Sequence, residues 1–275
     1  YITRVVEKGC KVAICEQMED PKQAKGIVKR EVIRVVTPGT TLSAQSLDES
    51  KNNYIMCIVC VDDTFGVSIA DITTGECMVT ELDKERKLLD EINKFMPAEI
   101  ICNQAFLVCG IDSGDLRERL GICINPLDDW YFDDDLCGRI LMQHFHTSAI
   151  EGLGIGDYES GTIAAGALFQ YLYETQKSDM AHMTSLTPYV TERFMLIDSS
   201  SRRNLELVET LREKQKRGSL LWVLDKTKTA MGARLLRSYV EQPLIDAGEI
   251  NLRLEAVEAL GDQAMIRDEI REYLQ

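Results

Sequence analysis

Cys57 and Cys60 form a C-x-x-C pair, a spacing that can bind zinc or form a redox disulfide when it lies in a turn. Here the pair lies within residues 54–61, an apolar run with the length and β-branched content of a strand. Because side chains alternate between the two faces of a strand, positions i and i+3 point in opposite directions. We therefore predict that the two thiols are separate core residues.

His144 and His146, together with Cys137 and His182, form a second set of metal-binding side-chain types. A tight zinc site needs three or four ligands that converge on one point. On a helix, residues two positions apart point about 200° away from one another, so the first two histidines diverge. The sequence predicts no metal site.

Acidic side chains allow the hypothesis of a nuclease that holds two cations about 4 Å apart between carboxylates. A ribonuclease-H-like nuclease needs one carboxylate in the middle of its first strand, and that strand reads IMCIVC here. The acids at 62, 63 and 71 lie at strand ends, and those at 133–135 are placed to cap a helix. A metal-dependent nuclease is therefore the alternative function rather than the favoured one.

Other catalytic and nucleotide-binding patterns are absent from the sequence. It contains neither the G-x-x-x-x-G-K-[ST] phosphate loop nor a G-x-S-x-G elbow. The glycines at 152, 154 and 156 do not complete a dinucleotide-binding pattern. We predict no catalytic, cofactor-binding or metal-binding residue, and no enzymatic activity for this chain.

Basic side chains are the remaining candidates for chemistry. Lys29, Arg30 and Arg34 lie on a β-branched stretch and could contact the phosphate backbone of DNA. The alternative for each is a solvated charge or an ion pair. A second group with the same two interpretations comprises Arg202, Arg203, Lys214, Lys216 and Arg217.

The composition is that of a globular protein and excludes several other classes. Of the 275 residues, 45% are hydrophobic and 28% are charged, which excludes a disordered or collagen-like chain. No apolar run approaches the roughly 18 residues of a membrane span, and no signal peptide opens the chain. The nine cysteines are odd in number and scattered, as in reduced cytoplasmic proteins. The first residue is not Met, so we expect a piece of a longer, cytoplasmic protein.

Charge divides the chain into blocks. The net charge is −14 overall, but it is +3 over residues 1–40, −17 over 41–200 and +5 over 201–241. The acidic middle is better suited to a protein partner than to nucleic acid, whereas both basic blocks could meet phosphate.

The order of expected elements predicts an α/β fold with a mixed sheet. Three strands separated by short turns are followed by alternating helices and strands, the order found in ribonuclease-H-like folds. A helical region follows. The expected strands cover 11–15, 27–36, 54–61, 65–72, 76–82, 99–102, 122–125 and 193–197, and the main helices cover 83–95, 113–120, 133–145 and 159–175.

The helix expected over residues 133–145 offers a candidate docking surface. Its apolar face, with Leu136, Ile140 and Leu141, should pack on the sheet and leave Arg139 and Gln143 directed outward. Arg139 is an isolated cation among acids, so a partner could recognise it.

Four segments in this order resemble the MutS family of bacterial DNA mismatch repair proteins. They are VAICEQMEDP at 12–21 with VKREVIRVVTPGT at 28–40, DITTGE at 71–76, DSSSRRNLEL at 198–207, and GSLLWVLDKTKTAMGARLLRSYVEQPL at 218–244. The resemblance implies the end of an α+β mismatch-binding domain over 1–42. It further implies a ribonuclease-H-like connector domain over 43–185 and the start of an all-α core domain over 190–275.

The same resemblance implies the partners of the parent protein. Family members dimerise around DNA, bind a mispaired duplex, use ATP with Mg²⁺ and recruit a MutL-like protein. They read the mispair with a Phe-x-Glu element, and no Phe in this sequence is followed by Glu two positions on. We expect that element upstream of Tyr1 and the ATPase phosphate loop beyond Gln275. A MutS paralogue with a different DNA target is a further alternative, which the upstream sequence would decide.

Overall fold

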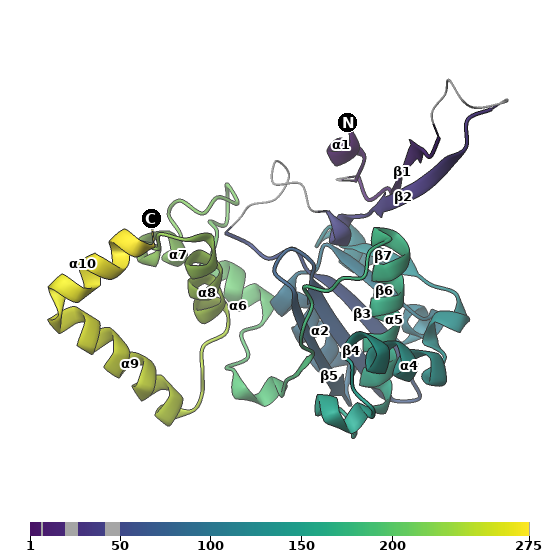
Figure 1. Ribbon diagram of the computed structural model, residues 1–275. Coiled ribbons are helices and arrows are strands. Elements are labelled where there is room, and N and C mark those ends of the chain that lie inside the picture. Colours follow the sequence, from purple (N-terminus) through teal and green to yellow (C-terminus); the bar gives the residue numbers. More distant parts are fainter. Residues whose placement is uncertain (7, 20–26, 42–49, 275) are drawn as a thin grey trace. The chain divides into compact units, whose positions relative to one another are not determined.

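The computed structural model describes residues 1–6, 8–19, 27–41 and 50–274. Two compact units make up the chain (Figure 1). Unit 1 contains residues 1–47 and 53–189, and unit 2 contains residues 48–52 and 190–275. Each unit is described below by itself.

Unit 1 is built on a six-stranded mixed sheet, which confirms the predicted α/β class. Strands β3, β4 and β5 form an antiparallel meander, and β6 and β7 add in parallel beside β3. The order across the sheet is β7-β6-β3-β4-β5-β8. The bounds are Ile55–Val61 for β3, Thr64–Asp71 for β4, Glu76–Leu82 for β5, Glu99–Cys102 for β6, Cys123–Pro126 for β7 and Thr187–Pro188 for β8.

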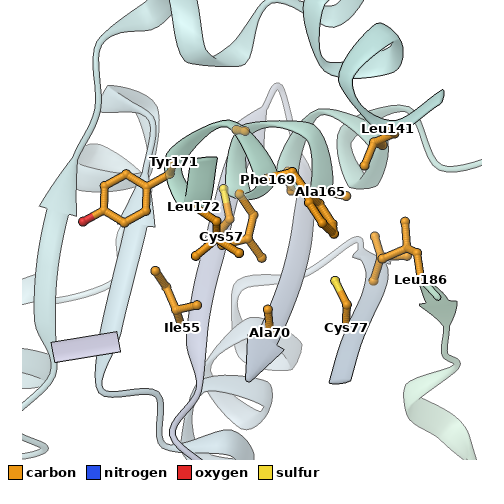
Figure 2. Close-up of a cluster of buried hydrophobic side chains, with 14 of the residues drawn as sticks. Ile55, Cys57, Ala70, Cys77, Leu141, Ala165, Phe169, Tyr171, Leu172 and Leu186 are labelled. Carbon is orange, nitrogen blue, oxygen red and sulfur yellow. The ribbon is translucent and has the colours of Figure 1, made fainter. Parts of the chain in front are cut away.

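Apolar side chains on both faces of the sheet form two separate cores. Alternate residues of β3 point to opposite faces, so Cys57 lies in one core and Cys60 in the other. The prediction that the two thiols are separate core residues is therefore confirmed. Figure 2 shows the first core, where strand residues such as Ile55 and Cys57 meet Phe169 and Leu172 of a long helix.

Helix α5 (Glu159–Gln176) covers one face of the sheet and is mostly buried. It starts against β4, where a Cβ on Gly66 would lie 1.9 Å from the carbonyl oxygen of Ser160. Helix α4 (Asp134–His144) packs on α5. A Cβ on Gly166 of α5 would lie 2.3 Å from Cys137 Cβ of α4.

The expectation that α4 packs directly on the sheet is therefore wrong, because α5 is the helix that it covers. The expected apolar face is also wider than the buried one: Leu141 is buried, whereas Leu136 and Ile140 are only partly buried. Helices α2 (Glu85–Phe95) and α3 (Ser113–Glu118) contribute Leu88, Ile92 and Leu116 to the second core.

The N-terminal part of unit 1 is a short helix followed by a two-stranded antiparallel ribbon. These elements are α1 (Ile2–Val6), β1 (Val12–Gln17) and β2 (Arg30–Val36). We refer to β1 and β2 together as the ribbon. A 3-10 turn over Pro38–Thr40 leads from the ribbon toward the sheet. The sequence also predicts a brief helical turn between Asp20 and Gly26 and a polar linker over 40–53. The turn and residues 42–49 of the linker lie outside the described residues.

Unit 2 is helical, and its buried hydrophobic cluster comprises Leu207, Val208 and Leu221. The strand expected over 193–197 does not form; a 3-10 turn at Thr191–Arg193 is followed by a single bridge between Phe194 and Leu244. In the described parts of both units, every helix is too short or too polar to cross a membrane. The helices of unit 2 are α6 (Ser199–Asn204), α7 (Leu220–Leu224), α8 (Ala230–Glu241), α9 (Ala247–Asp262) and α10 (Ala264–Tyr273).

Candidate joint and contact surfaces

Glu99, the first residue of β6, is a fully buried carboxylate with hydrogen-bond donors on both of its oxygens. Its Oε1 accepts a hydrogen bond from the hydroxyl of Tyr171 at 2.8 Å. Its Oε2 accepts one from the backbone N–H of Gly39 at 3.2 Å and another from Oγ1 of Thr37. A buried carboxylate without partners is strongly unfavourable, so these donors are what stabilise it.

The sequence TPGT gives the segment 37–40 the shape that reaches Glu99. The backbone N–H of Thr37 donates to Oγ1 of Thr40 at 2.9 Å, and the two threonine hydroxyls lie 2.9 Å apart. Because the Thr37 hydroxyl donates to Glu99, the Thr40 hydroxyl is the donor between the two threonines. Gly39 has no side chain, and a Cβ there would lie 2.8 Å from Ile55 Cβ and 3.0 Å from Glu99 Cβ.

Tyr171 contributes the connection from helix α5. Burial is the main cause that raises the pKa of Tyr171, with the nearby Glu99 carboxylate second. The tyrosine therefore keeps its proton, and its hydroxyl donates a hydrogen bond to Glu99. On the ribbon side, the Lys11 ammonium lies 5.6 Å from the centre of the Tyr171 ring, within the range of a cation–π contact.

Arg34 of β2 makes a second connection between the ribbon and α5. Its Nε donates to Oε1 of Gln176 at 2.9 Å, and its Nη2 donates to the carbonyl oxygen of Thr40 at 2.9 Å. Burial lowers the pKa of the Arg34 guanidinium. We use the name joint for the seven residues that these hydrogen bonds link: Arg34, Thr37, Gly39, Thr40, Glu99, Tyr171 and Gln176.

The three cations proposed for DNA contact differ in exposure and in their hydrogen-bond partners. Lys29 is exposed and forms an ion pair with Glu31 at 2.5 Å, and a hydrogen bond to Glu31 raises the pKa of Lys29. Arg30 is exposed at the start of β2. Arg34 is half-buried in the joint, so two of its guanidinium nitrogens are already hydrogen-bonded. DNA contact by these residues stays a prediction.

Helix α4 presents Arg139 and Gln143, the two predicted docking residues, as exposed side chains. The spacing of four places them on one side of the helix. The Nε of Arg139 donates to the carbonyl oxygen of Asp135 at 3.2 Å. Asp133 caps the helix by accepting a hydrogen bond from the N–H of Leu136 at 2.8 Å.

The histidine and cysteine candidates form no metal centre: among the described residues, no three His, Cys, Asp or Glu side chains are grouped to hold an ion. His144 Nε2 lies 2.7 Å from the carbonyl oxygen of Met183, and its Nδ1 lies 2.5 Å from the Tyr173 hydroxyl. A carbonyl only accepts, so Nε2 carries the proton and Nδ1 accepts from Tyr173. His182 likewise contacts the carbonyl oxygen of Ile72 at 2.8 Å.

Asp71, one candidate for a nuclease site, organises a turn. Its Oδ1 accepts hydrogen bonds from the N–H and hydroxyl of Thr73, at 2.8 and 2.6 Å. Its Oδ2 accepts one from the N–H of Asn53 at 3.2 Å. Asp71 therefore has a structural role, because its carboxylate stabilises the turn after β4.

Sequence reasoning missed Glu99 and Thr37, the centre of the joint. The available signals were a carboxylate at the head of an apolar strand, EIIC, and the compact TPGT turn. Neither signal identifies the other as its partner, because the two segments are 62 positions apart.

Three family models match the chain in succession. They are described as MutS domain I, matching residues 1–45, MutS domain II, matching residues 53–184, and MutS domain III, matching residues 200–275. In the joint, Thr37 and Gly39 lie in the first match, and Glu99 and Tyr171 lie in the second.

Curated relatives are similar over the whole chain. A protein named DNA mismatch repair protein MutS from Lachnoclostridium phytofermentans is 60% identical over 274 residues, which is 100% of this chain and 29% of the relative. Proteins of the same name from Ruminiclostridium cellulolyticum and Acetivibrio thermocellus are 47% and 44% identical over 277 residues, again 100% of this chain. The chain spans 31% and 32% of the lengths of those two relatives.

Proposed function

Because the chain belongs to the MutS family of DNA mismatch repair proteins, whose domains I to III it matches, we propose that it serves the recognition of mispaired DNA. Its own part in that task is to connect a DNA-contacting segment with a domain that a partner protein recognises. The ribbon is the DNA-contacting segment, and helix α4 carries the residues that the partner protein would recognise.

The observation that carries this proposal is the joint. One oxygen of Glu99 is bound by Tyr171 of the domain II match, and the other is bound by Thr37 and Gly39 of the domain I match. A single buried carboxylate therefore ties the ribbon to the sheet. Displacement of residues 37–39 with the ribbon would leave Oε2 of Glu99 buried without its donors, which is unfavourable, so we expect the two parts to move together.

The wider activity is that of the parent protein. We propose that the parent protein binds mispaired duplex DNA as a homodimer, uses ATP with Mg²⁺ and recruits a MutL-like protein in the cytoplasm. In this chain, Lys29, Arg30 and Arg34 would contact DNA phosphates, and Arg139 and Gln143 would contact the partner. We propose that the chain alone neither hydrolyses nor tightly binds ATP, and saturable ATP binding at micromolar concentration would contradict that.

Hydrogen exchange with and without duplex DNA tests the proposed connection in the whole 275-residue chain. Bound DNA should slow exchange of the backbone amides of β2 and, through the joint, of residues 37–40 and the start of β6. In E99A the slowing should be confined to the ribbon. The proposal fails if DNA leaves β2 unchanged, or if E99A shows the same spread of protection as the wild type.

Mispair preference gives a further check on the chain alone. DNA binding should be weak and salt-sensitive, because phosphate contacts release counterions. It should also be equal for mispaired and matched duplexes, because the sequence contains no Phe-x-Glu element. A several-fold preference for the mispaired duplex would contradict the assignment of mispair reading to other parts of the parent.

A further inference from the structure

Unit 2 carries a concentrated group of cations in an otherwise acidic protein. Residues 212–228 contain six Lys or Arg and two Asp or Glu, whereas the whole chain has 31 basic and 45 acidic residues. We use the name basic cluster for the six cations of this stretch: Arg212, Lys214, Lys216, Arg217, Lys226 and Lys228.

An ion pair brings the two halves of the basic cluster together. Lys216 precedes helix α7 and Asp225 follows it, and the Lys216 ammonium bonds to the Asp225 carboxylate. Helix α7 has five residues, so its rise is only about 7.5 Å. Asp225 also accepts hydrogen bonds from the N–H and hydroxyl of Thr227, at 3.1 and 2.5 Å. The cations before α7 therefore lie near those after it.

The backbone that carries the first half of the basic cluster is well defined by hydrogen bonds. The N–H of Thr210 donates to the carbonyl oxygen of Gln215 at 2.9 Å. The N–H of Lys214 donates to the carbonyl oxygen of Thr210 at 3.1 Å. The hydroxyl of Ser219 donates to the carbonyl oxygen of Lys216 at 2.7 Å. Lys214 has a φ of 49°, a left-handed conformation that is unusual for lysine.

Most of the charge in the basic cluster is not neutralised within the protein. All six cations are exposed. Within the described part of the chain, Lys216 is the member of the cluster that forms an ion pair. Like charges held close together repel one another, and the chain has acidic residues in excess that could have paired with them. The arrangement is therefore unfavourable alone and favourable beside an anion.

Helix α8 adds to the same positive potential. It begins at Ala230, directly after Lys226 and Lys228, with Thr229 as its N-cap. The N-terminal end of a helix carries partial positive charge, which disfavours cations there and favours anions. The two lysines thus stand where the backbone field already favours a negative ligand.

We propose that the basic cluster binds the phosphate backbone of duplex DNA. The choice of DNA as the polyanion rests on the proposed function, whereas the presence of an anion-binding surface rests on the charges and geometry of unit 2. Binding there supplies contacts that hold DNA without reading its sequence, since phosphate contacts carry no base information.

The test measures binding of a fluorescein-labelled duplex of about 20 base pairs to the whole chain over a range of salt concentrations. The variant K226Q/K228Q removes two exposed cations of the basic cluster, and K84Q/R86Q removes two exposed cations of unit 1 as a matched control. Each lost phosphate contact lowers the salt dependence of log K by about 0.9, so K226Q/K228Q should lower it by about 1.8. Adding R217Q should lower it further, and the control should match the wild type.

Fluorescence gives a local readout of the same event. The chain has two tryptophans, and Trp222 lies on α7 between the two halves of the basic cluster, with 47% of its surface exposed. In a W130F background, DNA should change the emission of Trp222, and K226Q/K228Q should reduce that change. Equal thermal unfolding of all variants confirms that the substitutions leave the fold intact.

Three results would overturn the proposal. If K226Q/K228Q binds like the wild type while K29Q/R30Q binds weakly, DNA contacts the ribbon alone; the inference fails and the proposed function stands. If the wild-type chain binds no DNA even at low salt, both fail. If a poly-glutamate peptide of equal charge competes as well as DNA does, the surface recognises an acidic protein instead.

Discussion

The hydroxyl of Tyr171 donates a hydrogen bond to Oε1 of Glu99 at 2.8 Å, at a place where Glu99 has no exposed surface and Tyr171 has 3%. The other oxygen of the same carboxylate receives Thr37 and Gly39. Glu99 is therefore bound from helix α5 on one side and from the end of the ribbon on the other.

Truncation of Glu99 should destabilise the chain more than its conversion to an amide. E99A leaves the donors of Thr37, Gly39 and Tyr171 buried without an acceptor, which should lower the free energy of unfolding by about 1–3 kcal/mol or more. In E99Q, the amide oxygen can accept from Thr37 and Gly39 while the amide nitrogen donates to the Tyr171 oxygen, so the loss should be smaller. Urea unfolding monitored by circular dichroism measures both.

The exposed Glu118 provides the control for these variants. E118A should change the free energy of unfolding by no more than about 0.5 kcal/mol, as most surface substitutions do. Equal losses for E99A and E118A would show that the joint contributes nothing to stability.

Two glycines on neighbouring helices should respond to alanine with opposite signs. A Cβ on Gly166 of α5 would lie 2.3 Å from Cys137 Cβ, so G166A should force α4 and α5 apart and lower stability by about 1–3 kcal/mol. A Cβ on Gly138 of α4 meets nothing within 4 Å. G138A should therefore raise stability by about 0.5–1 kcal/mol through helix propensity.

Thermal and urea unfolding of the two glycine variants measure these changes. A neutral G166A would mean that α4 does not contact α5 as closely as described. A destabilised G138A would mean that a neighbour covers that position.

Low pH should lower the stability of unit 2, because it protonates the Asp225 carboxylate. Its hydrogen bond to Lys216 is the first cause that lowers the pKa of Asp225 to about 2, from an ordinary value of 3.8. Since the folded-state pKa is the lower one, the stabilisation is present at neutral pH and is lost as the pH falls from about 4 to 2. D225N should remove this part of the pH dependence.

Because the Lys216 side chain is exposed and water screens the pair, D225N should cost about 1 kcal/mol at neutral pH and little at pH 2. Unfolding of the wild type and D225N, followed across this pH range by the fluorescence of Trp222 in a W130F background, measures the difference. Parallel pH profiles for the two proteins would refute the role of the Lys216–Asp225 pair.

Charge reversal on α4 should alter partner docking without unfolding the protein. Arg139 is exposed and its Nε donates a hydrogen bond to the carbonyl oxygen of Asp135, so R139E should change stability by less than about 0.5 kcal/mol. Binding to a MutL-like protein, measured by interferometry, should weaken. K84E reverses a charge on α2's N-cap and serves as the control. Equal binding by R139E and the wild type would show that the docking residue is wrongly chosen.

Local pattern was sufficient to predict strands β3 to β7 of the sheet. The β-branched runs with short polar turns gave the meander β3 to β5, because apolar strands of this length are stable only when buried on both faces. Strand β8 was not foreseen, since two residues carry no periodicity. The strand expected at 193–197 has a suitable apolar run, but no strand forms there because a single bridge pairs it with another segment.

The joint could not be predicted because it depends on contacts between distant segments. Arg34 looked like a DNA-binding cation from its position on a strand, and its hydrogen bonds to Gln176 and Thr40 appear only once α5 is in place. The exposure of Arg139 and Gln143 could be expected from helical spacing alone, even though the packing of α4 on α5 was not expected.

A double-mutant cycle between Thr37 and Glu99 tests most directly whether the buried carboxylate ties the ribbon to the sheet. T37V keeps the shape of the side chain and removes its hydroxyl, and E99Q keeps the shape and removes the charge. Because the two groups are directly hydrogen-bonded, the two losses in unfolding free energy should differ from additivity by about 0.5–3 kcal/mol. Additivity within about 0.3 kcal/mol would contradict the account.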